Sequence, residues 1–388
     1  MDVRPVSVLL ICYSYPPVLG GSELEAQRVS SALQQRGHKV KILCAGGDPM
    51  PPVTHWVDPC GIPVRIFGGR WPAALRGYVF AVGVAWTLFK ERGEYEIAYF
   101  LMQGLQLLSG LPVAGMLGKR IVMKFSGSGM VVQMTESLVG RLSLRFLRRW
   151  ASRVLILNPG MLEEAKQVGF DAGLMGWMPN PVDTDQFSPC SAELRAQLRQ
   201  ARNLTPDTPV VVFVGRLDAP KELPGLVSAF ALVVRERPLA KLVLIGDGPL
   251  REALEQRARV LGLERNVIFT GRLDTEGVIG WLRASDVFTL ISTLEGLPCS
   301  LIEAMSVGLA SVVSDIPAHT QLIEHEVQGL ITETGNQESI ARGLVRLIDD
   351  PQLRGRLGAA ARCRVIDQYS TPQVANCYEA LFASVLAS

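Results

Sequence analysis

The sequence predicts an α/β protein built from two Rossmann-like, doubly wound parallel-sheet domains. The chain has 388 residues, the length of two ordinary domains. Short apolar runs of strand length alternate with longer helical patterns, and this alternation starts again in the second half. Glycine-containing loops follow several of the apolar runs, where the carboxyl ends of parallel strands would lie. We therefore expect a first domain at residues 1–188 and a second at residues 189–370.

The first half opens with a βαβ unit. Residues 6–14 and 39–45 are apolar runs that predict two strands. Between them, residues 22–25 match a capping box, which predicts the start of a helix that Gly37 ends. The turn at residues 16–21 is rich in glycine, which lets backbone amides approach a phosphate at the helix start, although a tight turn alone explains the same residues. The dinucleotide fingerprint G-x-G-x-x-G does not occur.

The rest of the chain continues the alternation after one irregular stretch. Residues 46–72 hold many prolines and glycines and predict no regular element. Helical patterns cover residues 76–91 and the tail from about residue 337. The further predicted strands are residues 97–101, 120–125, 154–157, 210–214, 241–245, 267–270, 287–291 and 311–314. Between the two sets, the stiff connector at residues 179–189 predicts the end of the first domain.

Composition excludes several classes of protein. Hydrophobic residues make up 48% and charged residues 20%, as in a globular protein with large cores. The net charge of +2 gives no reason to expect nucleic acid as a partner. The seven cysteines contain no C-x-x-C pair, so we expect neither a disulfide framework nor a zinc site, and a reducing cytoplasm fits. The four histidines have no metal-ligand spacing, and the amino terminus lacks a signal-peptide pattern.

Three stretches raise the question of a membrane. Residues 97–118 are uncharged and long enough to span a bilayer, but Gln103 and Pro112 favour a buried strand followed by a helix. Residues 141–150 form a basic amphipathic pattern that suits either peripheral contact with an anionic membrane or an ordinary solvated helix face. Residues 71–89 are apolar and suit either a lipid-linked acceptor or a packed core.

Two acids flank a glycine loop in the second half. The apolar run 287–291 leads into the loop that carries Glu295, and residues 300–303 match a capping box that would begin a helix. Ligands bind at the carboxyl ends of strands in open α/β sheets, so this loop is a candidate binding site. Taken alone, however, Glu303 could serve only as a helix cap, and Glu295 could be a solvated loop acid.

Cations are expected at neighbouring strand ends. Arg216 and Lys221 follow the strand at residues 210–214, and together they suit a diphosphate, since arginine clamps phosphate oxygens and lysine adds a point charge. Gly246-Asp247-Gly248 and Gly271-Arg272 follow the next two strands. Each cation could equally be a solvated surface charge.

Taken together, these motifs resemble those of glycosyltransferase family four, the retaining group 1 glycosyltransferases of the GT-B fold. The resemblance spans nearly the whole chain and is strongest over residues 210–330. The matching motifs share their order along the chain with the family and are residues 16–23, 36–40, 179–183, 213–218 with Lys221, 244–249, and 295–298 with 303–305.

The resemblance implies a role for each catalytic candidate. Arg216 and Lys221 would bind the donor diphosphate and stabilise the leaving group. Glu295, with the amides of Gly296 and Leu297, would contact the donor sugar near its anomeric carbon.

Further donor contacts are implied around this group. Glu303 would hold the ribose and Arg272 would lie near the base. From the first domain, Gly20 and Gly21 would approach the phosphates. The family often has a histidine on a strand-end loop of that domain, and here Ser126 stands in the corresponding region, with no histidine nearby. Smaller departures are Glu222, Pro181 and Ala310, which look like loop variations.

The implied activity is transfer, with retention, of a hexose-type sugar from a nucleotide-diphosphate sugar to a hydroxyl of a glycan, lipid-linked or small-molecule acceptor. Neither cofactor nor metal is expected. The implied architecture has the two domains facing a central cleft, with residues 371–388 as a helix crossing back to the first domain. The implied location is the cytoplasm, with peripheral contact at the inner face of the membrane through the first domain left open.

Three alternatives to a transferase remain open. The missing histidine motivates a nucleotide-sugar-binding protein without transferase activity, against which the four residues Arg216, Lys221, Glu295 and Glu303 argue. A GT-B sugar-nucleotide epimerase would need catalytic acids or histidines at other strand ends, and a phosphorylase would need a pyridoxal-phosphate lysine motif. The sequence shows neither feature.

Overall fold

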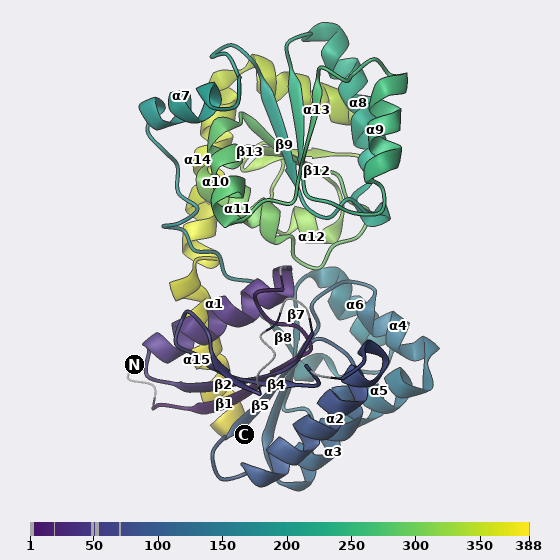
Figure 1. The fold of residues 1–388 in the computed structure, drawn as a ribbon, viewed down its shortest axis with the longest axis vertical. Coiled ribbons are helices and arrows are strands. Elements are labelled where there is room, and N and C mark those ends of the chain that lie inside the picture. Colours follow the sequence, from purple (N-terminus) through teal and green to yellow (C-terminus); the bar gives the residue numbers. More distant parts are fainter. Residues whose placement is uncertain (1–3, 19, 48–49, 51–53, 70, 388) are drawn as a thin grey trace. The chain divides into compact units, whose positions relative to one another are not determined.

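The computed structural model describes the chain except residues 1–3, 19, 48–49, 51–53, 70 and 388. It divides into two compact units (Figure 1), of which unit 1 contains residues 1–181 and 371–388 and unit 2 contains residues 182–370. The boundary therefore precedes the expected one at residue 188. The reason is that Val182 pairs with Ser370 and donates its backbone N–H to Tyr369 O at 2.9 Å, which attaches the connector to unit 2.

Unit 1 is built on an eight-stranded sheet with the order β3-β4-β2-β1-β5-β6-β7-β8. All neighbouring strands are parallel except β3 and β4. The strands are β1 (Ser7–Cys12), β2 (Lys39–Ala45), β3 (His55–Val57), β4 (Pro63–Phe67), β5 (Ile97–Leu101), β6 (Arg120–Lys124), β7 (Arg153–Ile156) and β8 (Met175–Trp177).

Helices cover both faces of this sheet. They are α1 (Gly21–Gln35), α2 (Ala73–Lys90), α3 (Leu105–Met116), α4 (Met130–Glu136), α5 (Leu138–Trp150), α6 (Pro159–Gln167) and α15 (Thr371–Ala387), with a 3₁₀ turn η1 (Ala172–Leu174). Right-handed crossovers place α2, α3, α4 and α5 on one face, because their connections all advance in the same direction along the sheet. The β1-to-β2 connection runs the opposite way, so α1 lies on the other face, where it packs with α15.

Unit 2 is a six-stranded parallel sheet with the order β11-β10-β9-β12-β13-β14. Its strands are β9 (Val210–Val214), β10 (Lys241–Ile245), β11 (Val267–Gly271), β12 (Val287–Leu290), β13 (Ala310–Ser314) and β14 (Gly329–Thr332). Its helices are α7 (Ala192–Gln200), α8 (Leu223–Glu236), α9 (Arg251–Val260), α10 (Thr275–Ala284), α11 (Cys299–Val307), α12 (Pro317–Thr320), α13 (Gln337–Asp349) and α14 (Pro351–Gln368), with a 3₁₀ turn η2 (Ala219–Lys221).

Most strands were expected because strands buried on both faces are continuous apolar runs. The bounds of β2, β5, β9 and β10 match the prediction to the residue. The prediction that residues 46–72 lack regular structure is wrong, since β3 and β4 lie there. Both are short strands rich in polar or exposed positions, so no apolar run marks them. The strands β8 and β14 were also missed.

The uncharged stretch at residues 97–118 is a strand followed by a helix, β5 and α3, as expected. None of the helices that the structure describes is both long and apolar enough to cross a membrane.

A buried ionic network holds α15 on unit 1. The ammonium of Lys124, at the end of β6, donates to Glu25 Oε1 on α1 and to Asn180 Oδ1 at 3.0 Å. Tyr378 of α15 donates to the same Glu25 oxygen at 3.4 Å, and its hydroxyl lies 2.8 Å from that of Tyr99. Lys124 is fully buried and Glu25 nearly so, and burial raises the pKa of Glu25 although Lys124 and Tyr378 oppose the shift. The network joins the chain's last helix to β6 and α1.

Replacing Lys124 tests this network. We expect Lys124→Met to lower the free energy of unfolding by about 3–5 kcal/mol, because it leaves a carboxylate buried without its cation. The double variant Lys124→Met/Glu25→Met removes both charges and should recover part of that loss. Urea unfolding of the whole chain measures both. A double variant that is no more stable than Lys124→Met would show that the ionic pair is not what the helix depends on.

Candidate active site

The strand order of unit 2 locates its switch point. Strands β9, β10 and β11 proceed in one direction from β9, and β12, β13 and β14 proceed in the other. Ligands in such sheets bind outside the carboxyl ends of the two strands at which the order reverses. In unit 2 these are β9 and β12, which are followed by residues 215–222 and 291–298.

Lys221 and Glu295 meet at this switch point. The Lys221 ammonium donates to Glu295 Oε1, and the Ser292 hydroxyl donates to the same oxygen at 2.6 Å. The loops are also joined through the backbone, since Thr293 N donates to Pro220 O at 2.8 Å. The side chains of the ion pair are only 19% and 11% exposed. The structure therefore brings together two of the three predicted catalytic residues, 74 positions apart in sequence.

Arg216 lies on the same loop as Lys221 but points outward. Its side chain is 69% exposed, and its Nε lies 3.5 Å from Asp218 Oδ2. A long, exposed guanidinium beside a partly exposed carboxylate is weakly held. Arg216 is thus placed to reach an anion at the β9 loop without breaking a buried contact.

Two glycines after β10 support the loop that carries Arg216. A Cβ at Gly246 would lie 1.9 Å from Gly215 O, and one at Gly248 would lie 2.4 Å from Leu217 O. Leu217 N in turn donates to Asp247 O at 3.0 Å. Only glycine allows the two strand-end loops to approach so closely, so these glycines have a packing role.

The paired-glutamate motif lies across the start of α11. The predicted capping box at residues 300–303 is wrong, because the helix begins one residue earlier, at Cys299, with Pro298 as its N-cap. Proline has no N–H for a box glutamate to accept, and its fixed φ sets the helix start. Glu303 is therefore in the middle of the helix, where it is 8% exposed. Gly296 and Leu297 lie in the loop between Glu295 and Pro298.

A buried histidine supports the loop that carries Glu295. His319 of α12 places Nδ1 at 3.0 Å from Ser314 Oγ and 3.1 Å from Ser314 O, at the end of β13. The Ser314 hydroxyl donates to Ser292 O at 2.5 Å, and Ser292 holds Glu295. Because that hydroxyl already donates, Nδ1 is the ring nitrogen that carries the proton. A chain of contacts thus runs from His319 to the Lys221–Glu295 pair.

The environment keeps His319 neutral. Burial lowers its pKa to about 4, and the charge of Lys221 acts in the same direction, while the backbone of Ser314 opposes it. Its Nε2 is buried and accepts no hydrogen bond from another described residue. Neither His319 nor the two serines was singled out from sequence. The signal available in the sequence was a serine at or near the carboxyl end of each of two neighbouring strands, which local patterns do not distinguish from any other polar residue at a strand end.

Arg272 lies at the same edge of the sheet, farther from the switch point. It is exposed and follows Gly271, whose φ of 73° ends β11. Gly246 N donates to Gly271 O at 2.9 Å, which aligns this loop with the one after β10. The structure shows no contact between Arg272 and the ion pair among the described residues, so its role near the base stays a prediction.

The predicted residues of unit 1 lie at the carboxyl edge of its own sheet. Gly20 is the N-cap of α1 and Gly21 its first residue, so the capping box predicted at residues 22–25 is wrong: the helix has already begun. Leu19 of the same predicted turn lies outside the described residues. Ser126 follows β6, and its hydroxyl contacts Met130 Sδ at 3.5 Å. The expected contacts of Gly20, Gly21 and Ser126 with a donor stay predictions.

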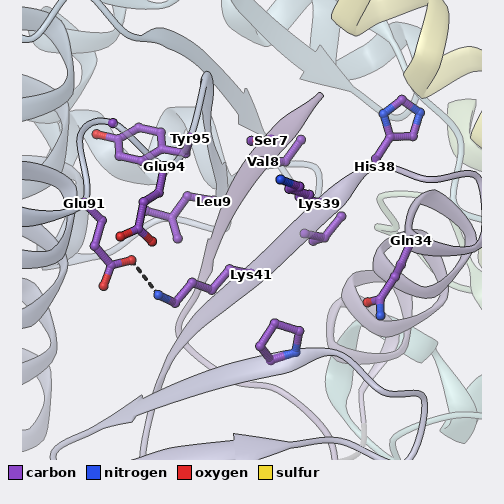
Figure 2. Close-up of a pocket in the computed structure, with 13 residues that line it drawn as sticks. Ser7, Val8, Leu9, Gln34, His38, Lys39, Lys41, Glu91, Glu94 and Tyr95 are labelled. Carbon is purple, nitrogen blue, oxygen red and sulfur yellow. Dashed lines mark hydrogen bonds and ion pairs between the residues drawn. The ribbon is translucent and has the colours of Figure 1, made fainter. Parts of the chain in front are cut away.

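Unit 1 also contains a pocket of about 590 Å³ at the opposite edge of its sheet (Figure 2). It lies at the amino ends of β1 and β2, where Lys41 donates to Glu91 Oε2 at 2.5 Å. Burial alone would raise the pKa of Glu91, but hydrogen bonds from Lys41 and Arg65 outweigh it and hold the pKa below its usual value. None of the predicted site residues lines this pocket, and its acid–base pair is satisfied internally.

Over the described part of the chain, no cluster of three or more histidine, cysteine, aspartate or glutamate side chains is arranged to hold a metal ion.

Two doubly wound sheets with loops gathered at their switch points define a Rossmann-like α/β protein. Residues 195–364 match the family described as glycosyl transferases group 1, and residues 20–181 match the glycosyl transferase 4-like domain. The chain belongs to the group 1 glycosyltransferases, of GT-B fold. The resemblance drawn from the sequence motifs is confirmed.

Three similar proteins match this chain over nearly their whole length. N-acetyl-alpha-D-glucosaminyl L-malate synthase of Bacillus anthracis is 22% identical over 383 residues, which is 97% of this chain and 96% of the relative. The HepE structure of Anabaena, in complex with UDP and glucose, has a TM-score of 0.82 at 21% identity and covers 98% of this chain and 100% of its own. Sucrose-phosphate synthase of Thermosynechococcus elongatus has a TM-score of 0.83 at 20% identity, covering 98% and 99%. At these identities the two structures show a shared fold.

The burial of His319 predicts a pH-dependent stability. Below pH 6.5 the unfolded chain binds a proton on this ring that the folded protein excludes until about pH 4. The neutral His319 ring therefore contributes fully to the free energy of unfolding above pH 6.5. As the pH falls, this contribution decreases, and at pH 4 the free energy of unfolding is lower by about 3 kcal/mol. The free energy of unfolding, measured in urea at pH 7.5 and at pH 4.5, should differ less between the two pH values for His319→Asn than for the native chain.

The exposed His325 provides the matched control for this measurement. His325→Asn should change the difference in unfolding free energy between the two pH values less than His319→Asn does, because the His325 side chain is 52% exposed. Equal pH dependence of the native chain and His319→Asn would contradict the neutral, buried state of His319.

Proposed function

We propose that this glycosyltransferase is a retaining hexosyltransferase that uses a nucleotide-diphosphate sugar as donor and needs no metal. The observation that carries the proposal is the Lys221–Glu295 pair at the switch point of unit 2, with the exposed Arg216 on the same loop. At this point Lys221 can bind phosphate, and the neighbouring carboxylate of Glu295 can face the sugar. The HepE structures, obtained with UDP and with UDP-glucose, support this class of donor.

The chemistry follows from the charges of these residues. The bond between the anomeric carbon and the β-phosphate oxygen breaks, and its electron pair leaves with the nucleoside diphosphate. Lys221 and Arg216 stabilise the negative charge that develops by forming charge-assisted hydrogen bonds with the phosphate oxygens. Glu295 exchanges its ion pair with Lys221 for contacts to the donor sugar and favours the positive charge that forms at the anomeric carbon.

Retention requires attack from the face that the diphosphate leaves. The acceptor hydroxyl forms the new bond to the anomeric carbon on that face, and its proton passes to the departing phosphate oxygen. No side chain has to act as base in this scheme. We propose Glu303 as the ribose contact, since it lies on α11, the helix that follows the carboxyl end of β12, and an acid at this edge of a doubly wound sheet can accept hydrogen bonds from ribose hydroxyls.

We propose that the acceptor is a hydroxyl of a glycan, lipid-linked molecule or small molecule, and that the enzyme works in the cytoplasm. No disulfide joins cysteines in the part of the chain that the structure describes, which suits a reducing compartment. The relatives act on several kinds of acceptor, so they leave this choice to experiment.

A donor panel tests the proposed function. The native chain is incubated with UDP-glucose, UDP-N-acetylglucosamine, UDP-galactose and GDP-mannose, and the released nucleoside diphosphate is measured with and without EDTA. We expect release from one donor, unaffected by EDTA, and a product whose anomeric configuration, read by NMR, matches that of the donor. Binding without release would favour a nucleotide-sugar-binding protein, and an interconverted donor would favour an epimerase.

Substitution of Glu295 separates catalysis from binding. Glu295→Gln should lower turnover about a hundredfold or more, because the carboxylate acts on charge that develops only in the transition state. The affinity for the nucleoside diphosphate, measured by calorimetry, should change far less. Glu338→Gln, at an exposed site on α13, is the matched control and should retain full turnover. Unchanged turnover in Glu295→Gln would remove this residue from the site.

Substitution of Lys221 should weaken nucleotide binding in addition to lowering turnover. Lys221→Ala should weaken binding of the nucleoside diphosphate about tenfold or more, the loss expected for one charge-assisted hydrogen bond. Thermal stabilisation at a fixed nucleotide concentration reports it directly, since a ligand at a hundredfold excess over its Kd adds about 2.7 kcal/mol to the stability. Equal stabilisation of the variant and the native chain would place the phosphates elsewhere.

A further inference from the structure

The outward face of α2 is apolar along its whole length. Its exposed large side chains lie three or four residues apart, which places them on one stripe of the helix. Trp71, just before the helix, extends the stripe. These exposed side chains of α2, which are between 43% and 69% exposed, belong to Leu75, Tyr78, Val82, Trp86 and Phe89. We call them, together with Trp71, the α2 stripe.

The opposite face of α2 already has its packing partners. Phe80, Val84 and Leu88 are fully buried. The helix packs against β2, β4 and α3, and the Ser109 hydroxyl of α3 donates to Ala81 O at 2.6 Å. A helix that is apolar on all sides is normally enclosed by protein or in contact with lipid. The α2 stripe is therefore not part of the core of unit 1, and exposed apolar patches of this kind mark interaction sites.

Positive charge lies on the same face of the sheet, one helix away from the α2 stripe. Helices α2, α3 and α5 share one face of the sheet and pack in that order (Figure 1). None of the three contains an aspartate or glutamate. On the outer face of α5, Arg141, Arg145 and Arg149 are exposed, and none forms an ion pair with another residue in the described part of the chain. Leu142, between Arg141 and Arg145, and Leu138, at the start of α5, are also exposed.

We propose that this face of unit 1, the α2 stripe with the outer side of α5, docks on an anionic lipid bilayer. Two tryptophans and a tyrosine in the stripe suit the boundary between acyl chains and headgroups, because their rings are apolar bodies with a polar atom. The arginines of α5 then contact anionic headgroups, and Leu138 and Leu142 enter between them.

A second copy of this chain fits the same face less well. Two such faces placed together would oppose arginines to arginines with no carboxylate on the three helices to neutralise them, and like charges brought together cost binding energy. A bilayer with anionic headgroups supplies both the apolar phase and the countercharge. The docking does not depend on the transfer reaction, but where the proposed function holds, it favours a lipid-linked acceptor.

Vesicle sedimentation of the full-length chain tests the proposal. We expect the native chain to pellet with phosphatidylcholine vesicles that contain phosphatidylglycerol, and much less with phosphatidylcholine alone. High salt should weaken binding, since the screening length falls to about 3 Å at 1 M. The variant Tyr78→Ser/Val82→Ser/Trp86→Ser should no longer pellet. Each of Arg141→Gln, Arg145→Gln and Arg149→Gln should weaken binding about fivefold, which corresponds to about 1 kcal/mol per charge near the surface.

The matched control removes exposed apolar side chains elsewhere. Leu239→Ser/Val260→Ser changes two side chains of unit 2 that are 64% and 74% exposed, and should pellet like the native chain. Nucleotide-dependent thermal stabilisation of every variant shows that folding and the unit 2 site are intact, so failure to dock is distinguishable from failure of the proposed function. Native chain that stays in the supernatant with both kinds of vesicle overturns the proposal. So does a dimer, seen by light scattering, that the α2 variant converts to a monomer, which would assign the face to a second copy.

Discussion

The ion pair between Lys221 and Glu295 is the contact around which the carboxyl edge of unit 2 is arranged. Both groups are mostly withdrawn from water, so each needs the other, and the Ser292 hydroxyl supplies a further donor to the carboxylate. Parallel pairing of β9 with β12 is what brings the two loops together. The neutral ring of His319 and the hydroxyl of Ser314 then hold the backbone of Ser292.

The same pair gives the enzyme a reason to hold both groups before substrate arrives. A lysine and a carboxylate that neutralise each other cost less to keep at a partly buried site than either does alone. Under the proposed function, a diphosphate and a sugar would together present the complementary charge and hydroxyls, so donor binding would replace the ion pair with contacts to the donor. Gly246 and Gly248 contribute differently. They allow the loop after β10 to pack against the loop after β9, and this packing fixes the backbone position of Arg216.

Local pattern predicted the fold best where burial is complete. The strands β2, β5, β9 and β10 are parallel strands that are buried over most of their length, so a run of mainly apolar residues marks each of them in the sequence. β3 and β4 were missed because short, half-exposed strands alternate too briefly to be distinguished from a loop. Both predicted capping boxes were wrong for a related reason: Gly20 and Pro298 set the helix starts through backbone conformation, ahead of the serine and glutamate that matched the motif.

The sequence by itself determined that two α/β sheets form and that Arg216, Lys221, Glu295 and Arg272 follow strands, because strand ends and glycine loops are local features. Only the tertiary structure decided which of these side chains meet, because strand order depends on contacts between segments far apart in the chain. It joined Lys221 to Glu295, left Arg272 two strands away from β9, and buried His319, which had no local signal. It also decided that the apolar residues of α2 divide between core and surface, since periodicity shows a stripe but not what covers it.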